Sequence, residues 1–142
     1  MIVAHRAGMR AWVAALAAAL TAAAVAHAAD AMLTAADLLK NPKFKSAYTA
    51  ALGPRANERW LAAMSNSAPV RTIQVAGEAY QVATPCKPHD CADNNLLLLY
   101  APASGKVYGH LHESGRVTLI GQPSPGLNRE LARLWKQEFR QQ

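Results

Sequence analysis

The spacing of apolar residues changes halfway along the chain and divides it into a helical part and a strand-rich part. In the first part, apolar positions recur every three to four residues, which is the repeat of a helix with one buried face. The pattern predicts helices over residues 34–40 and 42–52, with Thr34 and Asn41 as their capping side chains. A third short helix is predicted to carry Trp60, Leu61 and Met64 and to end at Ser65-Asn66-Ser67. We expect the apolar faces of all three helices to lie in the core.

From Val70 onward, apolar and polar residues alternate, which is the repeat of a strand with one buried face. Two strands are predicted on either side of a hairpin turn around Gly77-Glu78. Residues 96–100 are continuously apolar, which predicts a central strand with both faces buried. Two further strands follow, over residues 107–112 and 116–120, after short serine-glycine turns. The sequence therefore predicts a five-stranded antiparallel meander.

A final amphipathic helix is predicted after Ser124, its capping residue, with Pro125 at its first position. Its apolar face carries Leu127, Leu131, Leu134, Trp135 and Phe139. Its other face carries a basic stripe, typical of a solvated surface and also suited to an anionic partner: Arg129, Arg133, Lys136 and Arg140. The strand at 96–100 needs cover on both faces, and helices stand before and after the strands. The expected fold class is α+β, with helices packed on both faces of the sheet in three α/β/α layers.

The first 28 residues have the pattern of a secretory signal peptide. A basic start is followed by an alanine-rich apolar run and by Ala26-His27-Ala28, a small-x-small cleavage site. We therefore expect cleavage near this site and a single mature domain over residues 29–142 in the periplasm. Export also favours a bond between the only two cysteines, Cys86 and Cys91, because an oxidising compartment permits disulfides.

The charge of the chain narrows the classes of partner. Arg6 and Arg10 lie in the predicted leader, so the mature chain keeps 13 of the 15 basic residues against 9 acidic ones, a net charge of about +4. There is no run of five or more basic residues and no aromatic platform interleaved with arginines. We therefore expect no nucleic-acid partner.

The two cysteines bracket the segment Cys86-Lys87-Pro88-His89-Asp90-Cys91. If they are joined, the ring is small, and Pro88 removes one further backbone torsion from it. Closing so short a loop stabilises a fold by only about 2 kcal/mol in the chain-entropy model, too little for a staple of the whole domain. Local rigidity is the better explanation, since a loop already in its bound shape loses little entropy on docking. We expect a rigid disulfide loop that protrudes from the sheet, with His89 near its tip.

Two segments carry a resemblance to a known family: Tyr80-Gln81-Val82 and the hexapeptide that begins at Cys86. On these residues the chain resembles the Ivy family, the periplasmic inhibitors of vertebrate (c-type) lysozyme. The resemblance implies that the loop enters the lysozyme active-site cleft, where His89 hydrogen-bonds the catalytic carboxylates and protects peptidoglycan from cleavage.

The same resemblance implies roles for the other loop residues. Lys87 and Asp90 add hydrogen bonds at the rim of the cleft, and Pro88 keeps the tip narrow. It further implies that the protein is not an enzyme and uses no cofactor. The residues support this, because no Ser-His-acid set and no glycine-rich phosphate loop can be assembled from the sequence. A redox pair is also disfavoured, since four residues separate the cysteines and lead into a strand.

A metal site is an alternative on ligand type alone. The ring offers groups that suit zinc or copper at Cys86, His89, Asp90 and Cys91. A ring that oxidises in an exported protein would lose both thiolates, however. His110 and His112 share one face of a predicted strand, and we expect them to be exposed sheet residues.

The sequence is compatible with more than one target and more than one assembly state. C-type lysozymes are generally basic, as is this chain, so long-range attraction would be weak. The lytic transglycosylases of a bacterium cleave the same glycan with an acidic residue in a cleft, and the loop would suit them too. A monomer and a homodimer are both compatible with the sequence, provided that a dimer leaves the ring exposed.

Overall fold

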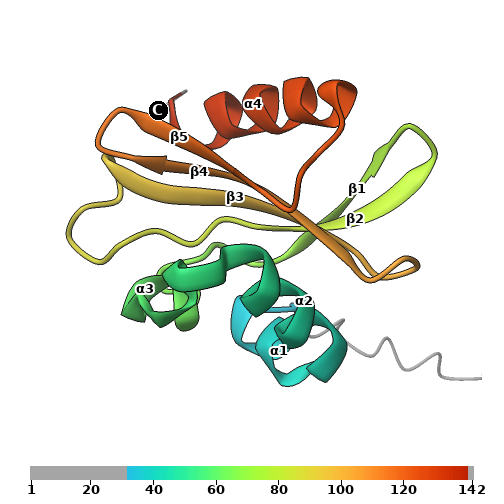
Figure 1. Cartoon of the computed structure of the whole chain (residues 1–142), viewed down its shortest axis with the longest axis horizontal. Helices are drawn as coiled ribbons and strands as arrows, with labels where there is room; N and C mark the ends of the chain where they lie inside the picture. Colours follow the sequence, from blue (N-terminus) through green and yellow to red (C-terminus); the bar gives the residue numbers. More distant parts are fainter. Residues whose placement is uncertain (1–31, 141–142) are drawn as a thin grey trace, which may run out of the picture. The chain divides into compact units, whose positions relative to one another are not determined.

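The computed structural model describes residues 32–140, which form a five-stranded sheet with helices on both of its faces (Figure 1). The helices are α1 (Ala35–Lys40), α2 (Pro42–Leu52), the 3₁₀ helix η1 (Gly53–Asn57), α3 (Arg59–Ala62) and α4 (Pro125–Phe139). The strands are β1 (Arg71–Val75), β2 (Glu78–Ala83), β3 (Asn94–Ala101), β4 (Lys106–Glu113) and β5 (Arg116–Ile120). The predicted signal peptide, residues 1–28, lies outside the described residues.

The sheet is an antiparallel meander in which the strands follow one another in chain order. The predicted α+β class with helices on both faces is therefore confirmed. The first hairpin turn lies one residue earlier than predicted, at Ala76 and Gly77, because Glu78 already pairs with Val75 in the sheet. Both turn residues have positive φ, as a two-residue turn between twisted strands requires.

The first face of the sheet is covered by α1, α2 and α3, which lie on one side of it in Figure 1. The core on this side is apolar and joins residues from three helices to alternate residues of β3. Phe44 of α2 stacks on Tyr48 and meets Tyr100 edge-on, with ring centroids 5.5 and 5.0 Å apart. The fully buried members of this core include Phe44, Leu61, Leu96, Leu98 and Leu111.

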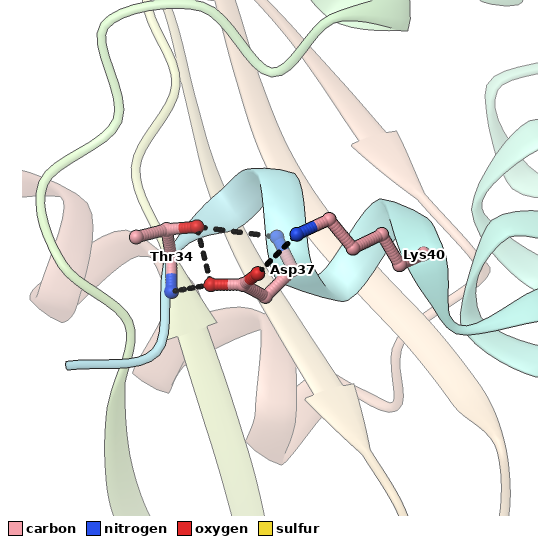
Figure 2. Close-up of polar contacts among 3 residues, drawn as sticks. All are labelled: Thr34, Asp37 and Lys40. Atoms are coloured by element: carbon pink, nitrogen blue, oxygen red, sulfur yellow. Dashed lines mark hydrogen bonds and ion pairs between the residues drawn. The ribbon is translucent and has the colours of Figure 1, made fainter. Parts of the chain in front are cut away.

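The N-terminus of α1 shows why so short a helix forms (Figure 2). The hydroxyl of Thr34 accepts from the Asp37 amide, and the Asp37 carboxylate accepts from the Thr34 amide at 3.1 Å. Lys40 donates to the other carboxylate oxygen at 2.8 Å. The hydrogen bonds from Lys40 and then Thr34 hold the pKa of Asp37 well below its usual range. The predicted cap is confirmed as a reciprocal capping box.

The third helix is shorter than predicted. The residues after α2 form η1, because Gly53 ends the α-helix with a positive φ and Pro54 cannot continue its hydrogen bonding. The following α3 has four residues and ends before Met64, which lies after the helix yet is buried. The short, irregular segment still places its apolar side chains against the sheet, so the core on this side is complete.

The second face is covered by α4, which lies across β3 and β4 (Figure 1). Ser124 caps the helix and Pro125 is its first residue, as predicted. The predicted apolar face packs against the sheet residues Tyr80, Val82, Leu97, Leu99 and Ala101. All four residues of the basic stripe are exposed, and the Arg140 guanidinium lies over the Trp135 ring. Within residues 32–140, no helix has the length and apolar character needed to cross a membrane.

Candidate functional site

The ring predicted from the sequence connects β2 to β3, at the end of the sheet where α4 also ends (Figure 1). Cys86 and Cys91 form a disulfide with their Cα atoms 4.9 Å apart. Cys86 is buried, whereas Lys87, Pro88 and His89 are exposed. The ring is thus anchored in the protein at its first residue and open to solvent at its tip.

The N-terminal arm of the ring is held by backbone groups. The Cys86 amide donates to the Ser65 carbonyl at 2.9 Å, and the Lys87 amide donates to the Asn94 carbonyl at 2.9 Å. Cys86 also forms an isolated antiparallel bridge with Asn95. The arm therefore extends the pairing of β2 and β3 up to the disulfide.

The tip is a tight turn that places His89 in an uncommon backbone conformation. The Asp90 amide donates to the Lys87 carbonyl at 3.0 Å, which closes the turn. His89 has a φ of 65°, a region that residues with side chains seldom adopt. Lys87 and Asp90 form an exposed ion pair at 3.5 Å, and Asn94 donates to Asp90 Oδ2 at 2.6 Å. These contacts restrain the turn on both sides of the exposed imidazole.

The C-terminal arm, residues 91–93, is held by three side chains and one backbone amide, and each of its three carbonyls has a partner. Asn95 Nδ2 lies 2.7 Å from the Cys91 carbonyl and 3.4 Å from the Ala92 carbonyl. Arg140 donates to the Ala92 carbonyl at 3.0 Å. The Asp93 carbonyl accepts from the Ser114 amide at 2.8 Å and lies 3.2 Å from Nδ1 of His112, which donates when it carries the ring proton.

Asn95, Arg140 and His112 all contact Trp135 of α4. The indole Nε1 donates to Asn95 Oδ1 at 2.6 Å in a buried hydrogen bond. The Arg140 guanidinium lies 4.6 Å from the indole centroid, and the imidazole of His112 lies 5.0 Å from it. The imidazole of His110 stacks on the same indole at 4.9 Å.

The prediction that His110 and His112 are exposed was wrong. They do share one face of β4, but α4 covers that face, and the side chains are only 6% and 8% exposed. Both ring nitrogens of His110 are buried without a hydrogen-bond partner. Burial, followed by the neighbouring His112, lowers the pKa of His110 below its ordinary value of 6.5. Burial therefore favours the neutral form of His110.

The geometry does not favour a metal site in the part of the chain that is described. The two cysteine sulfur atoms of the ring are bonded to each other, and residues 32–140 contain no group of three or more acidic, histidine or cysteine side chains arranged to hold a metal.

A hollow of about 500 Å³ lies beside the ring, lined in part by Trp60, Ser65, Lys87 and Pro88.

Comparison with known proteins places the ring in a family. A family model described as "Inhibitor of vertebrate lysozyme (Ivy)" matches residues 43–142, which includes the whole ring, the sheet and α4. The chain belongs to the Ivy family. The resemblance carried by the hexapeptide is thereby confirmed.

Two curated relatives share the family name "Inhibitor of vertebrate lysozyme". The Ivy relative of Escherichia coli K12 is 29% identical over 93 residues, covering 63% of this chain and 59% of the relative. The relative of Pseudomonas aeruginosa PAO1 is 32% identical over 75 residues, covering 51% of this chain and 49% of the relative. The chain thus spans between half and three fifths of the length of the curated Ivy proteins that it matches.

Sequence reasoning identified the ring but missed its supporting residues. All six predicted ring residues lie together, whereas Asn95, His112 and Arg140 reach the ring only through the fold. A signal for Asn95 was present, because two asparagines directly precede the apolar run of β3. Trp135 was predicted as a core residue, and its indole N–H had no predicted partner.

Proposed function

We propose that this protein is an inhibitor of c-type lysozyme that inserts the ring from Cys86 to Cys91 into the active-site cleft. The observation that carries the proposal is the geometry of the ring, which is fixed at both arms while its tip is exposed. The family and the names of its relatives support the same function. On this proposal the protein acts by binding and performs no catalysis.

Rigidity of the ring supports tight binding. A flexible loop loses conformational freedom when it docks, and each immobilised side chain costs about 0.5–1.5 kcal/mol. The disulfide, the turn at Lys87 to Asp90 and the contacts of both arms restrain this loop before it meets a partner. More of the contact energy is then retained as affinity.

His89 is the residue that we propose to contact the catalytic groups. A lysozyme cleft holds two carboxylates, of which one acts as acid and the other stays ionised. An imidazolium donates from both nitrogens and so can hydrogen-bond both carboxylates at once. Each such bond to a charged group stabilises a complex by about 1.5–3 kcal/mol. The side chain would also occupy the position of the scissile bond.

The remaining exposed residues of the ring would bind the walls of the cleft. Lys87 and Asp90 already pair with each other, so these two residues together carry no net charge into the cleft. Their outer hydrogen-bonding groups remain available to the rim, and Pro88 limits the width of the tip.

Export is part of the proposal. The leader over residues 1–28 would direct the chain to the periplasm, where cleavage near Ala28 leaves a single inhibitory domain over residues 29–142. The disulfide fits this compartment, because oxidising conditions maintain it. An inhibitor located there protects the peptidoglycan from host lysozyme.

The test is peptidoglycan lysis by a c-type lysozyme in the presence of the exported, oxidised protein. We expect inhibition that saturates near one inhibitor per lysozyme. His89→Ala should weaken inhibition by about 2–4 kcal/mol, or roughly 30-fold to several hundredfold, without loss of folding. The matched control is Lys106→Ala, an exposed residue at the opposite end of β3 from the ring, which should inhibit like the wild type.

A second target has a specific observation in its favour. The chain is basic, with a net charge of about +4 over residues 29–142, and a basic lysozyme would not attract it over long distances. An endogenous lytic transglycosylase offers a similar acidic cleft on the same glycan. If lysozyme is not inhibited, the same preparation and the same His89→Ala variant should be tested against such an enzyme.

A further inference from the structure

We propose that Trp135 is the positioning residue of the ring and acts through Asn95, His112 and Arg140. Three of the side chains that contact Trp135 also hold the three successive carbonyls of the C-terminal arm. One indole in α4 thus connects the helix, β3 and β4 to the segment that leaves the ring. For its effect on inhibition, this inference rests on the proposed function.

The burial of Asn95 is the strongest argument. Its side chain is 0% exposed and lies on the α4 side of β3, where the next residues on that face are Leu97 and Leu99. Burying an amide is unfavourable unless it is hydrogen-bonded, and an apolar residue would pack at least as well here. Asn95 satisfies both ends of its amide, with Trp135 on one side and the Cys91 carbonyl on the other. Its position therefore serves to orient the arm.

Trp135 contributes more than this one hydrogen bond. The faces of its indole contact the imidazole of His112 and the guanidinium of Arg140. A guanidinium that lies over an indole is restrained in orientation, and a donor held in this way keeps its hydrogen bond to the Ala92 carbonyl. The arm is fixed from the buried side by Asn95 and from the exposed side by Arg140.

On this proposal, the contacts of Trp135 hold the ring in position but add little to the stability of the domain, and one double variant tests this. Asn95→Leu with Trp135→Phe replaces both hydrogen-bond partners with apolar side chains, a change that is close to neutral for stability when packing is kept. The carbonyls of Cys91 and Ala92 then lose the Asn95 donor. We expect the ring to become mobile while the melting temperature changes little.

The first readout is the ¹⁵N relaxation of the free, oxidised protein. Backbone order parameters of Lys87 and of residues 89–93 should lie near 0.85 in the wild type and fall toward 0.6 in the double variant. The second readout is the inhibition constant for lysozyme, which should rise about tenfold because the mobile ring loses entropy on docking. Adding His89→Ala should remove most of this tenfold difference, since Trp135 acts through the ring.

The matched control is Tyr48→Phe on the other face of the sheet. Tyr48 also donates one buried hydrogen bond from an aromatic ring, to the Leu61 carbonyl at 2.8 Å. Its loss should lower stability while ring order and inhibition stay at the wild-type level. Arg140→Gln is a milder variant, because Arg140 is exposed and its replacement leaves the core intact. It should lower the order of residues 91–93 even if the double variant fails to fold.

The outcomes are distinct. Unchanged ring order in both the double variant and Arg140→Gln would overturn the positioning role. A mobile ring with unchanged inhibition would overturn its importance for binding. If the wild type fails to inhibit lysozyme, the proposed function fails, yet the order parameters still decide whether Trp135 positions the ring.

Discussion

The two faces of the sheet are built from the same strands but differ in what they bury. Toward α1, α2 and α3, the buried side chains of the strands are all apolar. Toward α4, the same strands are apolar at one end and polar at the end beneath the ring. The buried polar residues there are Asn95, His110 and His112, next to Trp135.

The difference shows how the fold divides two tasks. Apolar burial stabilises a domain without specifying one local geometry, because dispersion contacts have no direction. Hydrogen bonds and stacked rings add less stability, but they have defined distances and angles. The polar end of the α4 face contacts the C-terminal arm of the ring. Directional hydrogen bonds therefore orient the ring, where a partner would bind.

The largest effect is expected on the apolar face. Leu98 is 0% exposed in the central strand and packs toward the first three helices. Leu98→Ala should lower the free energy of unfolding by about 3 kcal/mol, through lost burial and a residual cavity. Urea unfolding measures this loss. Inhibition per folded molecule should stay unchanged, and a loss of ring order in this variant would erase the contrast between the faces.

Opening the ring should weaken inhibition more than it lowers stability. Replacing Cys86 and Cys91 by serine should lower stability by about 2 kcal/mol, because a loop this short contributes little closure entropy. Inhibition should fall by more than the roughly 30-fold that 2 kcal/mol represents. Parallel urea unfolding and lysozyme assays test this. A variant that fails to fold would make the disulfide a support of the fold itself.

A smaller effect is expected for His110, the buried histidine without hydrogen-bond partners. His110→Leu should raise stability at pH 7 by about 1 kcal/mol by removing unsatisfied polar atoms. The pKa of His110 is lowered in the fold, so below pH 6.5 the unfolded chain binds a proton that the folded chain does not. Keeping His110 neutral therefore costs the folded protein no stability above pH 6.5, and the folded protein loses stability relative to the unfolded chain as the pH falls below 6.5.

The leucine variant should therefore lose less stability than the wild type between pH 7 and pH 5. Urea unfolding at several pH values gives the difference between the two proteins, in which the titration of distant carboxyl groups cancels. Parallel pH curves for the two proteins would contradict the role assigned to burial of His110.

The smallest effect is expected at the cap of α1, far along the chain from the ring. Thr34→Ala removes the hydroxyl that accepts from the Asp37 amide and should lower the free energy of unfolding by about 0.5–1 kcal/mol. Thermal unfolding detects a change of this size. Ring order and inhibition should equal those of the wild type, and any change in them would show that the helix layer also positions the ring.

The success of the sequence analysis followed from local rules. The cap at Ser124 with Pro125 and the end of α2 at Leu52 were correct because capping chemistry depends on adjacent residues. The continuous apolar run at residues 96–100 correctly predicted helices on both faces, since each face had to be covered. The hexapeptide identified the ring because the cysteines and the residues between them are contiguous.

The wrong prediction for His110 and His112 has a physical cause. Alternation along β4 placed His110 and His112 on one face, but it could not show that α4 covers that face. Exposure depends on residues about 25 positions away in the chain, and no local rule relates the two segments.

The sequence by itself determined the order of helices and strands, the sheet with two covered faces and the ring with His89 near its tip. Periodicity, capping and a contiguous motif are enough for these, because each depends on neighbouring residues. Only the tertiary structure decided that Asn95, His112, Trp135 and Arg140 meet beneath the ring. Their meeting depends on how α4 lies across β3 and β4, and this packing is a property of the whole folded domain.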